Sequence, residues 1–340
     1  MSVTNAKIID RIYPLPVQRL LRISMVLAFV VFIVEMALIY SEPSLGLRLL
    51  WFATIPLAPM ILLVAPNAWV SICPISTVQT FSHRFGQNPH RRLSPRITAK
   101  LQAFGWVLMI AGIPTRHLFF NSVGWATFWT ALAILAVVLA AGFLFKSLSG
   151  WCVGACPIRP IEVLYGQFAL DKNRPEKCTD CSACIPSCQR LVPENSHSEL
   201  HRSSLTANIA MGFPGFVAAY FLLDLLNVCD IEHAFFAGTG AQGSDLLRLA
   251  GAVYGWMAAG FVVSWAAFFV LRRRLKERTL FRAIALSAFT AYYLGVAPEI
   301  REAWSLPFWS IPAMLVPPAV AMAWALWPSK LTDRTSRTPA

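Results

Sequence analysis

The chain has 340 residues, of which 56% are hydrophobic and only 14% are charged, and its formal net charge is +12. Soluble domains carry about 25% charged residues, and the long uncharged apolar stretches that recur along this chain exclude a soluble globular protein. In a membrane protein an excess of Lys and Arg reports first on topology, so the charge does not indicate nucleic-acid binding.

Eight apolar stretches are expected to cross the membrane. In chain order they are Ile23–Tyr40, Leu49–Pro66, Leu101–Thr115, Ser122–Phe145, Leu205–Cys229, Leu249–Leu271, Leu280–Pro298 and Ser305–Trp327. The third is short, and Arg116 and His117 are expected to close it. The first is long enough to span and no small-residue cleavage site follows it, so no cleavable signal peptide is expected.

The basic residues divide unequally between the two sides of this arrangement. Of the 29 Lys and Arg residues, 25 belong to the N-terminus, the C-terminus and the second, fourth and sixth loops, with Arg282 counted in the sixth. The other four loops hold only Arg48, Arg116, Arg248 and Arg301. The positive-inside rule therefore predicts that both termini and the Cys-rich loops are cytoplasmic.

The run Cys178-Thr-Asp-Cys181-Ser-Ala-Cys184-Ile-Pro-Ser-Cys188 has the spacing C-x2-C-x2-C-x3-C. This is the spacing of bacterial ferredoxins, in which three closely spaced thiolates hold one cuboidal cluster and the fourth reaches that cluster or a neighbouring one. Zinc sites usually use two pairs of ligands separated by a long insert, which four Cys within eleven residues do not match. The motif therefore predicts an iron–sulfur centre.

Two further stretches carry a Cys-Pro pair just past the cytoplasmic end of an expected span. They are Trp69-Val-Ser-Ile-Cys73-Pro74 and Trp151-Cys152-Val-Gly-Ala-Cys156-Pro157. The second has the spacing C-x3-C-P, which is the back half of a ferredoxin motif. The first is a degenerate copy in which Trp69 stands at the position of Cys152. The pattern indicates an internal repeat of two spans followed by a Cys-Pro turn. The alternative for Cys73 is that it is not an iron ligand and packs in the interior as a small apolar residue.

Two span pairs that each end in a Cys-Pro turn, followed by a ferredoxin motif, resemble the polytopic membrane ferredoxins of the NapH/NosR type. These are accessory proteins of periplasmic nitrate reductase and nitrous oxide reductase. The resemblance covers about residues 15–195 and implies 4Fe–4S clusters and electron transfer linked to the quinone pool. The chain departs from the family in having one full four-Cys motif, Gln189 instead of Pro after Cys188, and four additional C-terminal spans.

Two ligand sets remain open. In two-cluster ferredoxins the fourth Cys of each motif binds the other motif's cluster. Cross-ligation of this kind would give one cluster on Cys178, Cys181, Cys184 and Cys156, and a second site on Cys188, Cys152 and Cys73. The alternative is a single cluster on Cys178, Cys181, Cys184 and Cys188.

Glu35 and Asp224 lie in the outer thirds of the first and fifth spans, where ionisable groups are costly. They are candidates for a quinol or proton site, unless they simply reach the outer interface. His117 and His233 are expected to be solvated loop residues, so a haem is not expected. The loop Thr239-Gly-Ala-Gln242 lacks the second Thr of a flavin-attachment signature, so a covalent flavin is not expected either.

The sequence therefore predicts an all-α polytopic membrane protein with a small cytoplasmic ferredoxin-like iron–sulfur loop. The expected parts are a four-span half (1–148), a cluster-binding segment (149–202) and a second four-span half (203–340). The expected function is electron transfer between quinone and a partner redox protein in a bacterial inner membrane. Two alternatives are metal transport, or metalloenzyme assembly in which the cluster senses or reduces a metal. No catalytic residue is assigned, because a carrier subunit is expected rather than a stand-alone enzyme.

The charge distribution makes the topology testable. Reporter fusions after Arg202 and after Asp245 are expected to report the cytoplasmic side and the outer side, respectively. An outward signal at Arg202 would remove the third span from the scheme and move the Cys-rich loop to the other side of the membrane.

Overall fold

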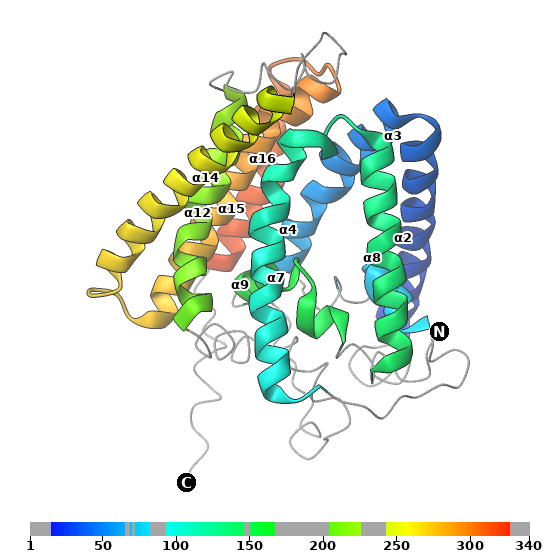
Figure 1. Ribbon diagram of the computed structural model, residues 1–340, viewed down its shortest axis with the longest axis horizontal. Coiled ribbons are helices and arrows are strands. Elements are labelled where there is room, and N and C mark those ends of the chain that lie inside the picture. Colours follow the sequence, from blue (N-terminus) through cyan, green and yellow to red (C-terminus); the bar gives the residue numbers. More distant parts are fainter. Residues whose placement is uncertain are drawn as a thin grey trace.

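The computed structural model describes residues 15–64, 69, 72–81, 93–145, 150–166, 204–225 and 243–326. Every regular element in these ranges is helical, and no strand occurs among them. Figure 1 shows the long helices running between two ends of the molecule, with α9 and the first turns of α7 and α12 toward the lower end.

The first half of the chain contributes the elements up to α9. They are α2 (Leu15–Ser41), α3 (Pro43–Leu49), η1 (Leu50–Thr54), α4 (Ile55–Val64), α6 (Pro74–Gln79), α7 (Pro95–Thr115), η3 (Arg116–Phe120), α8 (Gly124–Leu144), η4 (Trp151–Ala155) and α9 (Arg159–Tyr165). The three elements labelled η are π-helical turns. The second half contributes α12 (Ser204–Leu225), α14 (Gly243–Leu271), α15 (Glu277–Ala303) and α16 (Ser310–Leu326).

Seven helical stretches among the described residues are long and apolar enough to cross a membrane. They match the first seven expected spans, and α3, η1 and α4 together form the second. A helix needs about 20 apolar residues to cross the hydrocarbon core of a bilayer, and each of the seven stretches is about that long or longer. The chain is therefore a membrane-spanning helical protein.

The third and eighth spans differ from their expected bounds. The third does not end at Thr115, because the helix continues through η3 to Phe120 and reaches 25 residues. The eighth begins later than expected, because Ser305 has a positive φ of 51° and residues 304–309 form turns before α16. The 17 residues of α16 are at the lower limit for crossing a bilayer.

The most buried long helix is α12, with 56% of its apolar window inside the protein. It packs against α14 and α15 within the second half and against α7 of the first half. One cluster of buried apolar side chains includes Leu62 and Trp106 from the first half together with Met211 and Phe289 from the second. The two sets of spans therefore share a core, although the division into two halves itself stays a prediction.

Close contact between α12 and α14 depends on two glycines. A Cβ atom added at Gly215 would overlap the carbonyl oxygen of Gly260, and a Cβ at Gly260 would overlap that of Gly215. Small residues let helix backbones approach closely in membranes, where no hydrophobic effect drives helices together.

This contact gives a prediction with a control on the same helix. Gly260→Ala is expected to destabilise the protein by about 1–3 kcal/mol, because the added methyl group forces the two backbones apart. Gly255→Ala is expected to be neutral or slightly stabilising, since a Cβ there meets no atom within 4 Å. Thermal unfolding in detergent measures both, and equal shifts in melting temperature would contradict the assigned contact.

Candidate functional site: two Cys-Pro turns and a buried outer cluster

Cys73 and Cys156 adopt the same backbone conformation, with φ and ψ of −60° and 119° at Cys73 and −61° and 122° at Cys156. Each precedes a proline, whose ring excludes the helical region for the residue before it. Each backbone N–H donates to a Trp carbonyl oxygen, that of Cys73 to Trp69 at 2.8 Å and that of Cys156 to Trp151 at 3.0 Å. The two turns are therefore alike in structure, as the expected internal repeat requires.

The hydrogen bonds also correct the alignment of the two turns. Trp69 pairs with Cys73 as Trp151 pairs with Cys156, so Trp69 corresponds to Trp151 and not to Cys152. The second turn holds one residue more between its Trp and its Cys, and this extra residue is accommodated by the π-helical turn η4. Single π-helical turns are frequent at functional sites. Cys152 lies within this turn, and its exposed fraction is 3%.

A side chain of the first turn holds the second turn in place. The Cys152 N–H donates to Oε1 of Gln79 at 2.9 Å, across 73 residues of sequence, and Gln79 is fully buried. On the other side, α7 lies so close to η4 that a Cβ at Gly105 would be 3.1 Å from the carbonyl oxygen of Cys156. The structure therefore brings the three described cysteines into neighbouring turns at one end of the helices.

A buried ion pair lies directly after the second turn. Arg159 Nη1 is 3.2 Å from Glu162 Oε2, and both side chains are 4% exposed. The Arg159 N–H also donates to the Cys156 carbonyl oxygen at 3.1 Å. The ion pair therefore directly follows the Cys156 turn in the chain, and the Glu162 carboxylate balances the Arg159 charge. Sequence analysis missed Arg159 and Gln79, because the sequence does not show whether a basic or amide side chain in an expected loop is buried or which group it pairs with.

The four-Cys motif from Cys178 to Cys188 lies outside the described residues, as do His233, Cys229 and the loop around Thr239. The segment that carries the motif connects the end of α9 to the start of α12, both of which lie toward the lower end in Figure 1. Within the described ranges, no three His, Cys, Asp or Glu side chains are grouped closely enough to hold a metal ion.

At the opposite end of the helices, polar side chains are buried between the two halves. Glu35 is 4% exposed and accepts a hydrogen bond from the Thr54 hydroxyl, so its carboxylate does not reach the outer interface. His117, which was expected to be solvated, is 1% exposed, and its ring nitrogen is 3.3 Å from the Tyr220 carbonyl oxygen. Asp224 lies in the last turns of α12, and its side chain is not described.

Arg116 belongs to this outer cluster, although sequence analysis placed it at the end of the third span. Its guanidinium carbon lies 4.2 Å from the centre of the Trp51 ring and 5.2 Å from that of Tyr220. Its Nε donates to Oδ1 of Asn121 at 3.1 Å. Aromatic faces and an amide oxygen stabilise a buried cation. The helix can therefore continue past Arg116 inside the protein, although hydropathy alone predicts that the span ends there.

Aromatic rings in contact connect the outer cluster with α9 at the cysteine end. The successive contacts between ring centres are Tyr220–Phe221 at 5.0 Å, Phe221–Tyr292 at 5.7 Å, Tyr292–Tyr293 at 5.1 Å, Tyr293–Phe289 at 4.7 Å and Phe289–Tyr165 at 5.8 Å. Edge-to-face and tilted ring pairs at these distances are favourable packing contacts. The two polar ends of the protein are therefore joined by tightly packed side chains.

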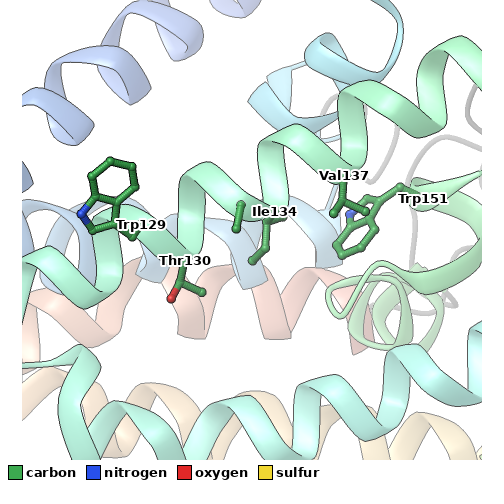
Figure 2. Close-up of a pocket in the computed structure, with 6 residues that line it drawn as sticks. Trp129, Thr130, Ile134, Val137 and Trp151 are labelled. Carbon is green, nitrogen blue, oxygen red and sulfur yellow. The ribbon is translucent and has the colours of Figure 1, made fainter.

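An open groove of about 410 Å³ follows α8 from Trp129 to Trp151, as Figure 2 shows. Its lining is apolar apart from Thr130 and the indole nitrogens, and Trp129 is 57% exposed. Such a surface suits the acyl chain of a lipid, and we assign it no part in the site.

Comparisons of the chain with protein-family models, curated protein sequences and solved structures found no match. The assignment of function therefore depends on the residues and their geometry.

The hydrogen bond between Gln79 and the Cys152 N–H can be tested by substitution. Gln79→Met keeps the side-chain volume but leaves the buried Cys152 N–H without its acceptor, which is expected to cost about 1–3 kcal/mol. The melting temperature should fall, and a maleimide should label Cys152 faster in iron-free protein. Val78→Ala, which changes the next side chain on α6, is the control. Equal labelling rates in the two variants would show that Gln79 does not hold the turn.

Proposed function

We propose that the chain is an integral membrane iron–sulfur electron-transfer protein of the membrane ferredoxin type. Cys178, Cys181 and Cys184 hold a 4Fe–4S cluster, and the Cys-Pro turns supply further thiolates. The protein exchanges electrons between the quinone pool and a partner redox protein.

The observation that carries this proposal is the pairing of the two Cys-Pro turns. Cys73 is far in sequence from Cys152 and Cys156, yet α6 and η4 are in contact and are joined by the hydrogen bond between Gln79 and Cys152. The cysteine-rich segment leaves α9 and enters α12 at the same end. Thiolates from three separate segments near one place are what an iron–sulfur site requires.

The residues around the turns suit such a centre chemically. Four thiolates give a 4Fe–4S cluster a net negative charge, and the cluster itself supplies the one-electron chemistry. Burial of Cys152 excludes water from the ligand, and the buried ion pair between Arg159 and Glu162 follows the Cys156 turn directly in the chain. Hydrogen bonding, burial and nearby charge are the levers by which a protein sets a cluster's potential.

We place the clusters on the cytoplasmic side of a bacterial inner membrane, with both termini on that side. Arg96 and Lys100 in the first turns of α7, and the basic turn Arg272–Arg274 between α14 and α15, lie at the same end as the Cys-Pro turns. The cytoplasm is also where thiols stay reduced and available as iron ligands. In this arrangement α16 is the eighth span and returns the chain to the cytoplasmic side.

The test is an iron count with anaerobic ultraviolet–visible and paramagnetic-resonance spectra of the full chain. Under cross-ligation, Cys156→Ser perturbs the first cluster and Cys188→Ser perturbs the second. Under the single-cluster model, about four irons are bound, Cys156→Ser is silent and Cys188→Ser damages the cluster. Cys229→Ser, which changes the one Cys outside the three groups, is the control and is expected to be silent.

The same preparation separates this function from its alternative. Absence of iron–sulfur absorption in anaerobically prepared protein would overturn the proposal. Uptake of a metal ion into vesicles by the protein alone, without a redox partner, would favour metal transport. Reduction of the cluster by quinol, or its oxidation by quinone, would support electron transfer.

A further inference from the structure

The outer cluster is built from two π-helical turns that lie against each other. Trp51 of η1 donates its indole N–H to the Phe120 carbonyl oxygen of η3 at 3.0 Å, and its ring lies over the Arg116 guanidinium. The Thr127 hydroxyl donates to the same carbonyl oxygen at 3.2 Å. A π-helical turn displaces carbonyl groups from the regular helix ladder, and in a membrane these must find partners inside the protein. Single π-helical turns inside α-helices are frequent at functional sites.

Two hydrogen-bond donors have no acceptor within the described part of the chain, one in this cluster and one joined to it through the Phe221 ring. They are Nη2 of Arg116 and the hydroxyl of Tyr292, and both atoms are inaccessible to solvent. Arg116 as a whole is 8% exposed. Buried polar groups are nearly always paired, so two buried donors from η3 and α15 indicate an acceptor that is not among the described residues.

The charges around Tyr292 restrict what that acceptor is. The Phe221 ring lies 5.0 Å from that of Tyr220 and 5.7 Å from that of Tyr292, which is near enough to Arg116 and Glu299 to interact with both charges. One charge of each sign favours an uncharged ligand, because an anion would be repelled by Glu299 and a cation by Arg116. The position between spans requires a molecule that is soluble in lipid. An uncharged lipid-soluble molecule with carbonyl oxygens meets all three conditions.

We propose that η1, η3, α12 and α15 form a quinone-binding site, in which Arg116 Nη2 and the Tyr292 hydroxyl donate hydrogen bonds to the carbonyl oxygens of the quinone ring. This rests on the proposed function for the choice of a quinone among carbonyl compounds. It differs from the sequence-based expectation, in which Glu35 and Asp224 define the quinol site. Both donors are buried in the structure, so entry of the ring requires movement of a neighbouring side chain.

The test is equilibrium binding of a short-chain ubiquinone or menaquinone analogue to the detergent-purified full chain, followed by quenching of tryptophan fluorescence. Tyr292→Phe is expected to weaken binding about fivefold, because one neutral hydrogen bond is lost. Arg116→Gln is expected to weaken it by about tenfold or more, because a charged donor is lost. Wild-type affinity in both variants would overturn the proposal.

Tyr293→Phe is the matched control on the same helix. The Tyr293 hydroxyl donates to the Pro56 carbonyl oxygen, so its removal is expected to lower the melting temperature and leave quinone affinity unchanged. Tyr292→Phe is expected to do the reverse, since no protein acceptor is lost in the ligand-free protein. A lower melting temperature for Tyr292→Phe with unchanged affinity would show a structural role only and would overturn the site.

Two further experiments distinguish failure of the quinone site from failure of the proposed function, and quinone binding from lipid binding. The double variant Cys178→Ser, Cys181→Ser is expected to bind the quinone with wild-type affinity, because the site uses no cysteine. Tyr292-dependent binding in a protein that proves to hold no iron would support the site and refute the proposed function. Loss of quinone binding on addition of phospholipid alone would assign the donors to a lipid ester carbonyl and overturn the quinone assignment.

Discussion

The structure depends on one constraint of the hydrocarbon environment, which is that every backbone polar group must be paired inside the protein. Regular α-helices meet it over most of the described chain, and three short π-helical turns depart from them. Two of these departures are compensated by side chains from other helices or turns. Trp51 and Thr127 pair with the Phe120 carbonyl oxygen, and Gln79 pairs with the Cys152 N–H. The irregular turns are therefore also the places where polar side chains gather.

The two polar regions lie at opposite ends of the same helices and differ in chemistry. The lower end in Figure 1 holds the Cys-Pro turns with their thiols, a buried ion pair and many exposed basic residues. The upper end holds Arg116 and His117 among aromatic rings, together with Glu35. The continuous ring contacts between Tyr220 and Tyr165 mean that packed protein, not lipid, separates these regions.

The resemblance to membrane ferredoxins does not explain the second set of spans, but the structure gives these spans a role in packing. The helix α12 packs into the core shared with the first half, and its Tyr220 contacts both Arg116 and His117. Tyr292 of α15 contacts Phe221, which in turn contacts Tyr220. The outer cluster therefore combines residues of both sets of spans, and the first four spans alone would leave Arg116 without one of its two aromatic faces.

Apolar length and the conformation before proline are local properties, so the seven long spans and the Cys-Pro turns can be predicted from the sequence. Features that need a partner from elsewhere in the chain become visible only in the folded protein. The third span continues past Arg116 because Trp51 and Tyr220, from two other helices, enclose the cation. Cys152 is fixed by Gln79, 73 residues away. Hydropathy and motif spacing are properties of one local stretch of sequence. Burial of a polar group is favourable only when another helix or turn supplies its hydrogen-bonding or charged partner, and only the folded structure shows that partner.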